Sequence, residues 1–184
     1  MLIQAARDEM RGIIATPKTT PEQYLSVHLR RGDKHAVSWR YQTAGYVPIP
    51  EYVQALQDVS LRLPAHPGSA MAVYIASDSP SAEAELVAGL PSNSRLLSLG
   101  RSQNPDLRIL ASPKAYVQSE FDKLASDKRV NLTRGMVVDF AMLSGTWARN
   151  DDIIPKAAVC TIRYVEPYYM LSCAILSCPQ LGYM

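Results

Sequence analysis

At residues 25–34 the chain reads LSVHLRRGDK, an apolar run that ends abruptly in two arginines, a glycine, an aspartate and a lysine. The pattern predicts a short buried strand over residues 24–29 that leads into a charged loop. In open α/β sheets, ligands bind at the carboxyl ends of the strands. Because guanidinium groups match phosphate oxygens in pairs, adjacent arginines at such a place indicate an anion site, and a diphosphate is the natural candidate.

The two arginines of this stretch are not expected to act alike. Side chains alternate along a strand, so Arg30 and Arg31 point to opposite faces, and only one of them should contact phosphates directly. The other pairs with Asp33 or with another carboxylate to hold the loop. His28 shares the side of Arg30, where it either hydrogen-bonds a nucleotide or belongs to the core. A surface ion-pair cluster without a ligand is the alternative for the whole group.

Composition limits the classes of protein to consider. The 184-residue chain is 47% hydrophobic and 20% charged, with a net charge of +2, which is typical of one globular domain. The small net charge gives no general attraction to nucleic acid, so any anion site must be local. No apolar run of about 18 residues occurs, and residues 1–14 read as an amphipathic helix rather than a signal peptide. We therefore expect no membrane insertion by this chain.

Metal and common nucleotide motifs are not found in the sequence. The cysteines Cys160, Cys173 and Cys178 show no CxxC spacing and lie far from the histidines, so a zinc site is not expected. Buried free thiols are the favoured interpretation, and a Cys173–Cys178 disulfide is left open. Neither GxxxxGK[ST] nor GxGxxG occurs. We interpret Asp151 and Asp152 as a solvated loop rather than a metal site.

Apolar strands and amphipathic helices alternate along the chain, which predicts an α/β fold with a mostly parallel sheet flanked by helices. The expected strands cover residues 24–29, 70–76, 95–99 and 157–162. The expected helices cover residues 2–14, 50–63, 80–90, 113–125 and 132–147. The aromatic segment at residues 35–48 suggests a lid or a packed Ω-loop. Residues 1–162 form one domain in this interpretation, and residues 163–184 form a tail of unassigned structure.

Further polar residues are expected near the first strand end. Right-handed crossovers bring the carboxyl ends of parallel strands to one edge of the sheet, so Asp78 and Thr161 should lie near Arg30. Asp139 stands inside an apolar helical run, where a carboxylate without a partner is costly. It could accept hydrogen bonds from the N1–H and amino group of a guanine ring. A structural pair with an arginine or a backbone amide is the alternative.

Four segments together resemble the superfamily of α-1,6-fucosyltransferases and protein O-fucosyltransferases. The stretch VHLRRGDK (residues 27–34) resembles its first signature, and YIASDSPS (residues 74–81) resembles its second. The stretch LTRGMVVDFAMLS (residues 132–144) is similar to the third, and VCTI (residues 159–162) to the strand that opens the last. Order and spacing agree over about residues 24–162.

The resemblance implies the carboxyl-terminal, Rossmann-like half of a GT-B enzyme. Such an enzyme binds GDP-fucose and transfers fucose to a glycan or protein acceptor with inversion, without a metal cofactor. By matching position, Arg30 would contact the β-phosphate and stabilise the departing GDP, a catalytic role, and His28 and Asp139 would lie beside the guanosine. The other residues implied in donor binding are Arg31, Asp33, Lys34, Asp78 and Thr161.

Two departures from the family pattern bear on activity. Small hydroxyl residues that touch phosphates normally follow the Cys-Thr pair, whereas this chain continues with RYVEP (residues 163–167). A glutamate proposed as general base in the α-1,6 enzymes has no counterpart in AVSW (residues 36–39). The alternative is a truncated or catalytically inactive nucleotide-binding or interaction domain of the same fold. The family implies the Golgi lumen, but the sequence itself predicts no location.

Overall fold

The computed structural model of the chain describes residues 1–14, 24–33, 46–62 and 70–160. Within them, four parallel strands form one sheet in the order β3-β2-β1-β4. These strands are β1 (Tyr24–Leu29), β2 (Ala72–Ser77), β3 (Arg95–Leu97) and β4 (Pro155–Cys160). The order places β1 and β2 side by side in the centre of the sheet, so the charged exit of β1 lies next to the exit of β2.

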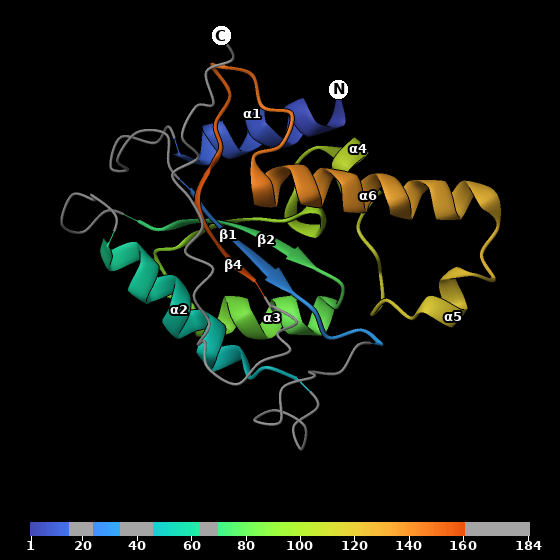
Figure 1. The fold of residues 1–184 in the computed structure, drawn as a ribbon, viewed down its shortest axis with the longest axis horizontal. Coiled ribbons are helices and arrows are strands. Elements are labelled where there is room, and N and C mark those ends of the chain that lie inside the picture. Colours follow the sequence, from blue (N-terminus) through green and yellow to red (C-terminus); the bar gives the residue numbers. More distant parts are fainter. Residues whose placement is uncertain (15–23, 34–45, 63–69, 161–184) are drawn as a thin grey trace, which may run out of the picture.

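Helices cover both faces of the sheet. The described helices are α1 (Leu2–Ile14), α2 (Ile49–Arg62), α3 (Pro80–Gly89), α4 (Pro105–Arg108), α5 (Gln118–Phe121) and α6 (Ser126–Ser144), with the 3-10 turn η2 (Leu99–Arg101). Figure 1 shows α2 and α3 on one face, and α1 and α6 on the other. The short α5 lies near the start of α6, outside both layers. The α/β class with a parallel sheet, predicted from the sequence, is confirmed.

The alternation of side chains along β1 builds a separate core on each face. Leu25, Val27 and Leu29 are buried in the core beneath α2 and α3. Tyr24 and Ser26 point the other way, where their hydroxyls donate to the carbonyl oxygens of two residues near the end of α6, at 2.8 Å and 3.0 Å. A strand covered on both sides explains why its sequence is almost continuously apolar.

Local signals at two helix ends account for where those helices begin or stop. The predicted start of α3 is confirmed: Ser79 caps the helix by accepting from the Ala82 N–H, and Pro80 occupies the first turn. The helix expected at residues 132–147 instead spans Ser126–Ser144. It stops because Gly145 adopts φ +73°, a left-handed conformation that glycine accepts without steric cost.

The helix expected at residues 113–125 is wrong, because only Gln118–Phe121 are helical. The backbone of Tyr116 makes other hydrogen bonds. Its N–H donates to the Asp78 carbonyl oxygen at 2.8 Å, and its carbonyl oxygen accepts from the Asp33 N–H at 3.0 Å. Tyr116 therefore joins the loops that follow β1 and β2, and long-range pairing replaces the helix that local propensity favours.

Several sequence expectations fall on parts of the chain that the structure does not describe. The loop at residues 35–48, apart from residues 46–48, lies outside the described residues, and so do the tail at residues 163–184, Cys173 and Cys178. Among the helices that are described, none has the length and apolar character needed to cross a bilayer.

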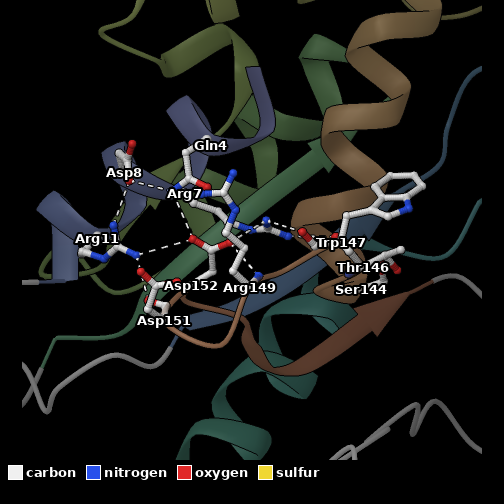
Figure 2. A network of polar contacts seen from close by, with 10 residues as sticks. All are labelled: Gln4, Arg7, Asp8, Arg11, Ser144, Thr146, Trp147, Arg149, Asp151 and Asp152. Carbon is white, nitrogen blue, oxygen red and sulfur yellow. Dashed lines mark hydrogen bonds and ion pairs between the residues drawn. The ribbon is translucent and has the colours of Figure 1, made fainter. Parts of the chain in front are cut away.

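A buried arginine joins α1 to the turn that follows α6 (Figure 2). The Arg7 side chain is 2% exposed and pairs with the Asp152 carboxylate at 3.2 Å. It also donates to the carbonyl oxygens of Thr146 at 2.8 Å and Trp147 at 3.1 Å. These bonds satisfy carbonyl groups just beyond the end of α6 and tie the amino-terminal helix to the chain that leads into β4.

Asp152 is the central carboxylate of this network. It accepts hydrogen bonds from the Arg149 N–H at 2.8 Å and from Gln4 at 3.1 Å. The Arg149 bond, the Gln4 bond and the charge of Arg7 together lower the pKa of Asp152. The expectation of a solvated loop is therefore wrong for Asp152, whose side chain is 3% exposed, although Asp151 is exposed. Two adjacent aspartates look alike in sequence, and it is contacts with the distant Gln4 and Arg7 that distinguish Asp152 from Asp151 in the fold.

Removal of the central carboxylate should destabilise the fold. Asp152→Ala leaves the Arg7 guanidinium buried without its counter-ion, so we expect the free energy of unfolding to fall by about 3 kcal/mol. Asp151→Ala is the matched control and should change it by less than about 0.5 kcal/mol, as surface substitutions usually do. Urea denaturation measures both variants. Equal stability of the two would show that the Arg7–Asp152 pair contributes nothing.

Candidate functional site

The loop after β1 is held in place by Asp78, the residue that follows β2. The Asp78 carboxylate accepts from the backbone N–H of Arg31 at 2.7 Å and of Gly32 at 3.1 Å. The Asp78 N–H in turn donates to the Leu29 carbonyl oxygen at 3.3 Å. Charge-assisted bonds to two successive amides fix the direction in which the chain leaves the sheet. The sequence assigned Asp78 to the second strand end, and this contact gives it a specific partner.

Gly32 is required by the tight packing of this loop. A Cβ atom at this position would lie 2.2 Å from the Tyr116 carbonyl oxygen and 2.9 Å from Asp78 Oδ2. Both distances are far below van der Waals contact, and the carbonyl belongs to backbone that is itself hydrogen-bonded. Sequence reasoning gave Gly32 no role, because the neighbour that excludes a side chain lies more than eighty positions away in the chain (32 against 116).

Arg31 is held on the α3 side of the sheet. Its Nη1 atom donates to both carboxylate oxygens of Glu85, at 2.9 Å and 2.8 Å. The guanidinium also lies over the ring of Tyr46, 5.3 Å from the ring centre, within the range of a cation–π contact. Of the two arginines, Arg31 is thus the one that pairs with another carboxylate and anchors the loop.

Arg30 lies beside other carboxylates than Arg31 does and is less tightly held. Its nearest carboxylate oxygens belong to Asp33 at 3.9 Å and Asp78 at 4.0 Å, both beyond hydrogen-bond distance. The side chain is 33% exposed. Within the described residues the Arg30 guanidinium is therefore oriented by two carboxylates without its donors being used, which leaves them available to an anion.

Asp33 completes this cluster of charges. One of its carboxylate oxygens accepts from the Gln118 N–H at 2.8 Å. The other, Oδ1, is buried and makes no hydrogen bond to a residue that the structure describes. This oxygen can therefore accept a hydrogen bond from a donor group beside Arg30.

His28 lies near the end of β1 and alternates with Val27 and Leu29, so its side chain is on the face of the sheet away from α2 and α3. Burial lowers the pKa of His28, with the charge of Asp78 opposing the shift and that of Arg30 adding to it. The imidazole is therefore neutral at pH 7 and carries one donor and one acceptor. Beside a bound nucleoside, a neutral imidazole can donate or accept one hydrogen bond without adding charge.

Asp139 lies on the same face of the sheet, where α6 crosses β2. Its Oδ1 atom accepts from the Tyr74 hydroxyl at 2.7 Å. Burial raises the pKa of Asp139 from its ordinary 3.8 to about 7; the Tyr74 bond opposes this shift and the charge of Glu83 adds to it. The partner is thus a tyrosine rather than the arginine or backbone amide that the sequence left open. The second oxygen, Oδ2, takes no part in that bond.

The structure brings together most of the residues that the sequence singled out. His28, Arg30, Arg31, Asp33 and Asp78 all lie at the adjoining ends of β1 and β2. Asp139 lies on the same face as His28 but contacts β2 at Tyr74. Lys34 and Thr161 lie outside the described residues. In the part of the chain that is described, no group of three or more histidine, cysteine or acidic side chains is placed to hold a metal ion.

Comparison with known protein families gives no matching family model, and comparison with curated protein sequences gives no match either. The geometry at the ends of β1 and β2 is therefore the basis for assigning a role to this site.

Substitution of Gly32 should show how tightly the loop is built. Gly32→Ala forces its new methyl group against the Tyr116 carbonyl oxygen, and we expect a loss of about 2 kcal/mol in the free energy of unfolding. Gly12→Ala is the matched control. Nothing lies within 4 Å of a Cβ at Gly12, and alanine in a helix should be neutral or stabilising by about 0.5–1 kcal/mol. Urea denaturation of both variants checks this, and an unperturbed Gly32→Ala protein would contradict the clash.

The raised pKa of Asp139 predicts a specific dependence of stability on pH. Between pH 3.8 and about 7 the unfolded chain is ionised at this position whereas the folded protein keeps the proton. The contribution of Asp139 to the free energy of unfolding therefore falls as the pH rises through this window. Asp139→Asn cannot ionise and still offers an oxygen to Tyr74, so it should lack this slope. Urea denaturation from about pH 4.5 to about pH 8 tests the difference. Parallel profiles of the variant and the natural protein would refute it.

Proposed function

We propose that the chain is a fucosyltransferase-like domain that binds GDP-fucose at the adjoining carboxyl ends of β1 and β2. The observation that carries the proposal is the Arg30 guanidinium, which lies at the central strand end with its nearest carboxylates 3.9 Å and 4.0 Å away. A pyrophosphate supplies oxygens that can take the unused donors. The place is also the one where open parallel sheets bind ligands.

The phosphate end of the donor would rest on Arg30. Arg31 cannot share this role while it holds Glu85 on α3, so one arginine shapes the loop and the other meets the ligand. Lys34 and Thr161 belong to the same proposed donor site on the strength of the family resemblance. Asp33 and Asp78 orient the Arg30 side chain and keep the loop in register.

The nucleoside end would extend along the face covered by α6. In this proposal neutral His28 contacts the nucleoside, and Asp139 accepts from the N1–H and amino group of guanine. Only the ionised carboxylate accepts both bonds. Because the pKa of Asp139 is about 7, both protonation states are populated near neutral pH, and bound guanine should favour the charged one.

Transfer of fucose would depend on the placement of the pyrophosphate on Arg30. The bond between the anomeric carbon of fucose and the β-phosphate oxygen breaks, GDP leaves with the electron pair, and an acceptor hydroxyl of a glycan or protein attacks from the opposite side with inversion. Arg30 would stabilise the negative charge that develops on the departing β-phosphate. The acceptor proton goes to a base that is not assigned, and the proposal requires no metal ion.

A second candidate function is nucleotide binding without transfer. The sequence favours it at one point: residues 36–39 carry no carboxylate where the α-1,6 enzymes have their proposed general base. Calorimetric titration with GDP, GDP-fucose and ADP tests binding in both candidates, and both expect a preference for GDP over ADP. Measurement of GDP release from GDP-fucose, with and without glycan or peptide acceptors, then separates an enzyme from a binding domain.

Arg30→Ala should weaken GDP binding without unfolding the protein. Loss of charge-assisted hydrogen bonds to the phosphates costs about 1.5–3 kcal/mol, or about 10- to 100-fold in Kd. Arg62→Ala, an exposed arginine at the end of α2, is the control and should leave Kd unchanged. Calorimetry gives Kd and thermal melting gives stability. A collapse of the melting temperature with no specific loss of binding would make Arg30 a structural residue.

A further inference from the structure

The outward face of α6 carries an unusual density of exposed apolar side chains. Val130, Val137 and Phe140 follow one another at helical spacing and are 45%, 42% and 53% exposed. Residues three, four and seven apart share a helix face, so these side chains form one stripe. Trp147, just beyond the helix, extends the stripe by packing edge-on against Phe140 with ring centres 6.1 Å apart. We call these four residues, with Arg129 and Arg134, the α6 face.

The α6 face is concave at one end. An open pocket of about 600 Å³ lies between α6, the start of α1 and the short helix α5. Val130 and Val137 line it from α6, and Leu2, Ile3 and Phe121 line it from the other two helices. The pocket contains none of the residues of the β1–β2 site. An apolar pocket that continues into an exposed apolar stripe is typical of an interaction surface.

The backbone holds Trp147 outward under strain. Its φ of +60° is a left-handed conformation that a bulky side chain rarely adopts. The carbonyl oxygens of Thr146 and Trp147 are both bound by the buried Arg7 guanidinium, which keeps the turn in this shape. The result is a large aromatic side chain that is 61% exposed on a rigid support. Tryptophan in such a position is a frequent anchor residue of protein interfaces.

Two cationic side chains line the pocket and can bind a partner of opposite charge. Arg129 and Arg134 both line it and are exposed. Neither makes an ion pair with a carboxylate in the described part of the chain, so both can bond to the carboxylates of a partner. Arginine is also the charged residue that interfaces retain most often. The surface therefore complements apolar groups flanked by carboxylates.

We propose that the α6 face docks an acidic amphipathic segment of another protein. Apolar side chains of that segment fill the pocket at Val130 and Val137 and cover the Phe140–Trp147 pair, while its carboxylates bond to Arg129 and Arg134. A concave site with cations at its rim fits a peptide better than a lipid surface, because a bilayer cannot enter the pocket. This docking site is separate from the proposed nucleotide site.

Model peptides test the proposal with the full chain. The probe is a fluorescein-labelled helix-forming peptide of roughly 18 residues, five turns, with leucines along one face and glutamates on both flanks. One comparison peptide carries lysine in place of glutamate, and another is a scrambled sequence of the same composition. Fluorescence anisotropy measures binding, and the emission of Trp147 in a Trp39→Phe background reports burial of that ring. We expect binding and a blue shift with the acidic peptide alone.

Variants locate the binding surface. Val137→Asp and Arg134→Glu should each weaken binding of the acidic peptide by at least about tenfold, as loss of an interface anchor does. The matched controls are Leu61→Asp and Arg62→Glu, exposed residues at the end of α2, which should leave binding unchanged. All four positions are on the surface, and circular dichroism checks that each variant folds.

Several results would overturn the proposal. Equal binding of the basic or scrambled peptide would show that binding does not depend on complementary charge. Equal losses of binding in the α2 controls would show that the peptide does not bind at the α6 face. Displacement of the probe by a synthetic peptide of residues 163–184 would assign the pocket to the chain itself. Binding of anionic vesicles that Val137→Asp abolishes, or a concentration-dependent dimer in sedimentation that it disrupts, would assign the face to a membrane or to a second copy.

Discussion

The Asp78 carboxylate, bonded to the N–H groups of Arg31 and Gly32, is the contact on which the proposed site depends. It joins the exits of two neighbouring strands, and Tyr116 adds a third segment through its backbone. Because one carboxylate accepts from two successive amides, it fixes the direction of the backbone at Arg31 and Gly32. The loop therefore leaves the sheet with its arginines already oriented, which lowers the entropy cost of binding a ligand there.

The fixed exit gives two adjacent arginines different tasks. Arg31 is held by Glu85 on α3, whereas Arg30 lies beside Asp33 and Asp78. The face covered by α6 carries His28 and Asp139, two groups whose pKa values are shifted by burial. Titrating groups with shifted pKa values cluster at functional sites, and structural networks shift pKa values as well. The Arg7–Asp152 pair is such a structural network, and it lies beside the carboxyl-terminal end of α6.

The sequence predicted the central architecture well because its signals are local. The strand at residues 24–29 and the start of α3 at Pro80 are confirmed to the residue, since apolar runs and helix-start signals act over a few positions. The separate partners of Arg30 and Arg31 fit the same period of two. Contacts between distant segments were not predictable in this way.

Gly32 illustrates the limit most clearly. Its role depends on Tyr116, and the helix expected around Tyr116 is itself absent because that backbone pairs with the strand ends. Asp152 is a second case, since its burial depends on Arg7, which reads in sequence as one charge of an amphipathic helix. In both cases the partner is set by the tertiary fold, and no spacing rule connects the two positions.

A crystal structure of the full chain with GDP is the decisive test of the Arg30 site. We expect the β-phosphate to lie within hydrogen-bond distance of the Arg30 guanidinium, at about 2.7–3.0 Å, while Arg31 stays on Glu85. A pyrophosphate bound elsewhere, for example on Arg129 and Arg134, or an Arg30 side chain that closes onto Asp33 and leaves GDP unbound, would contradict it.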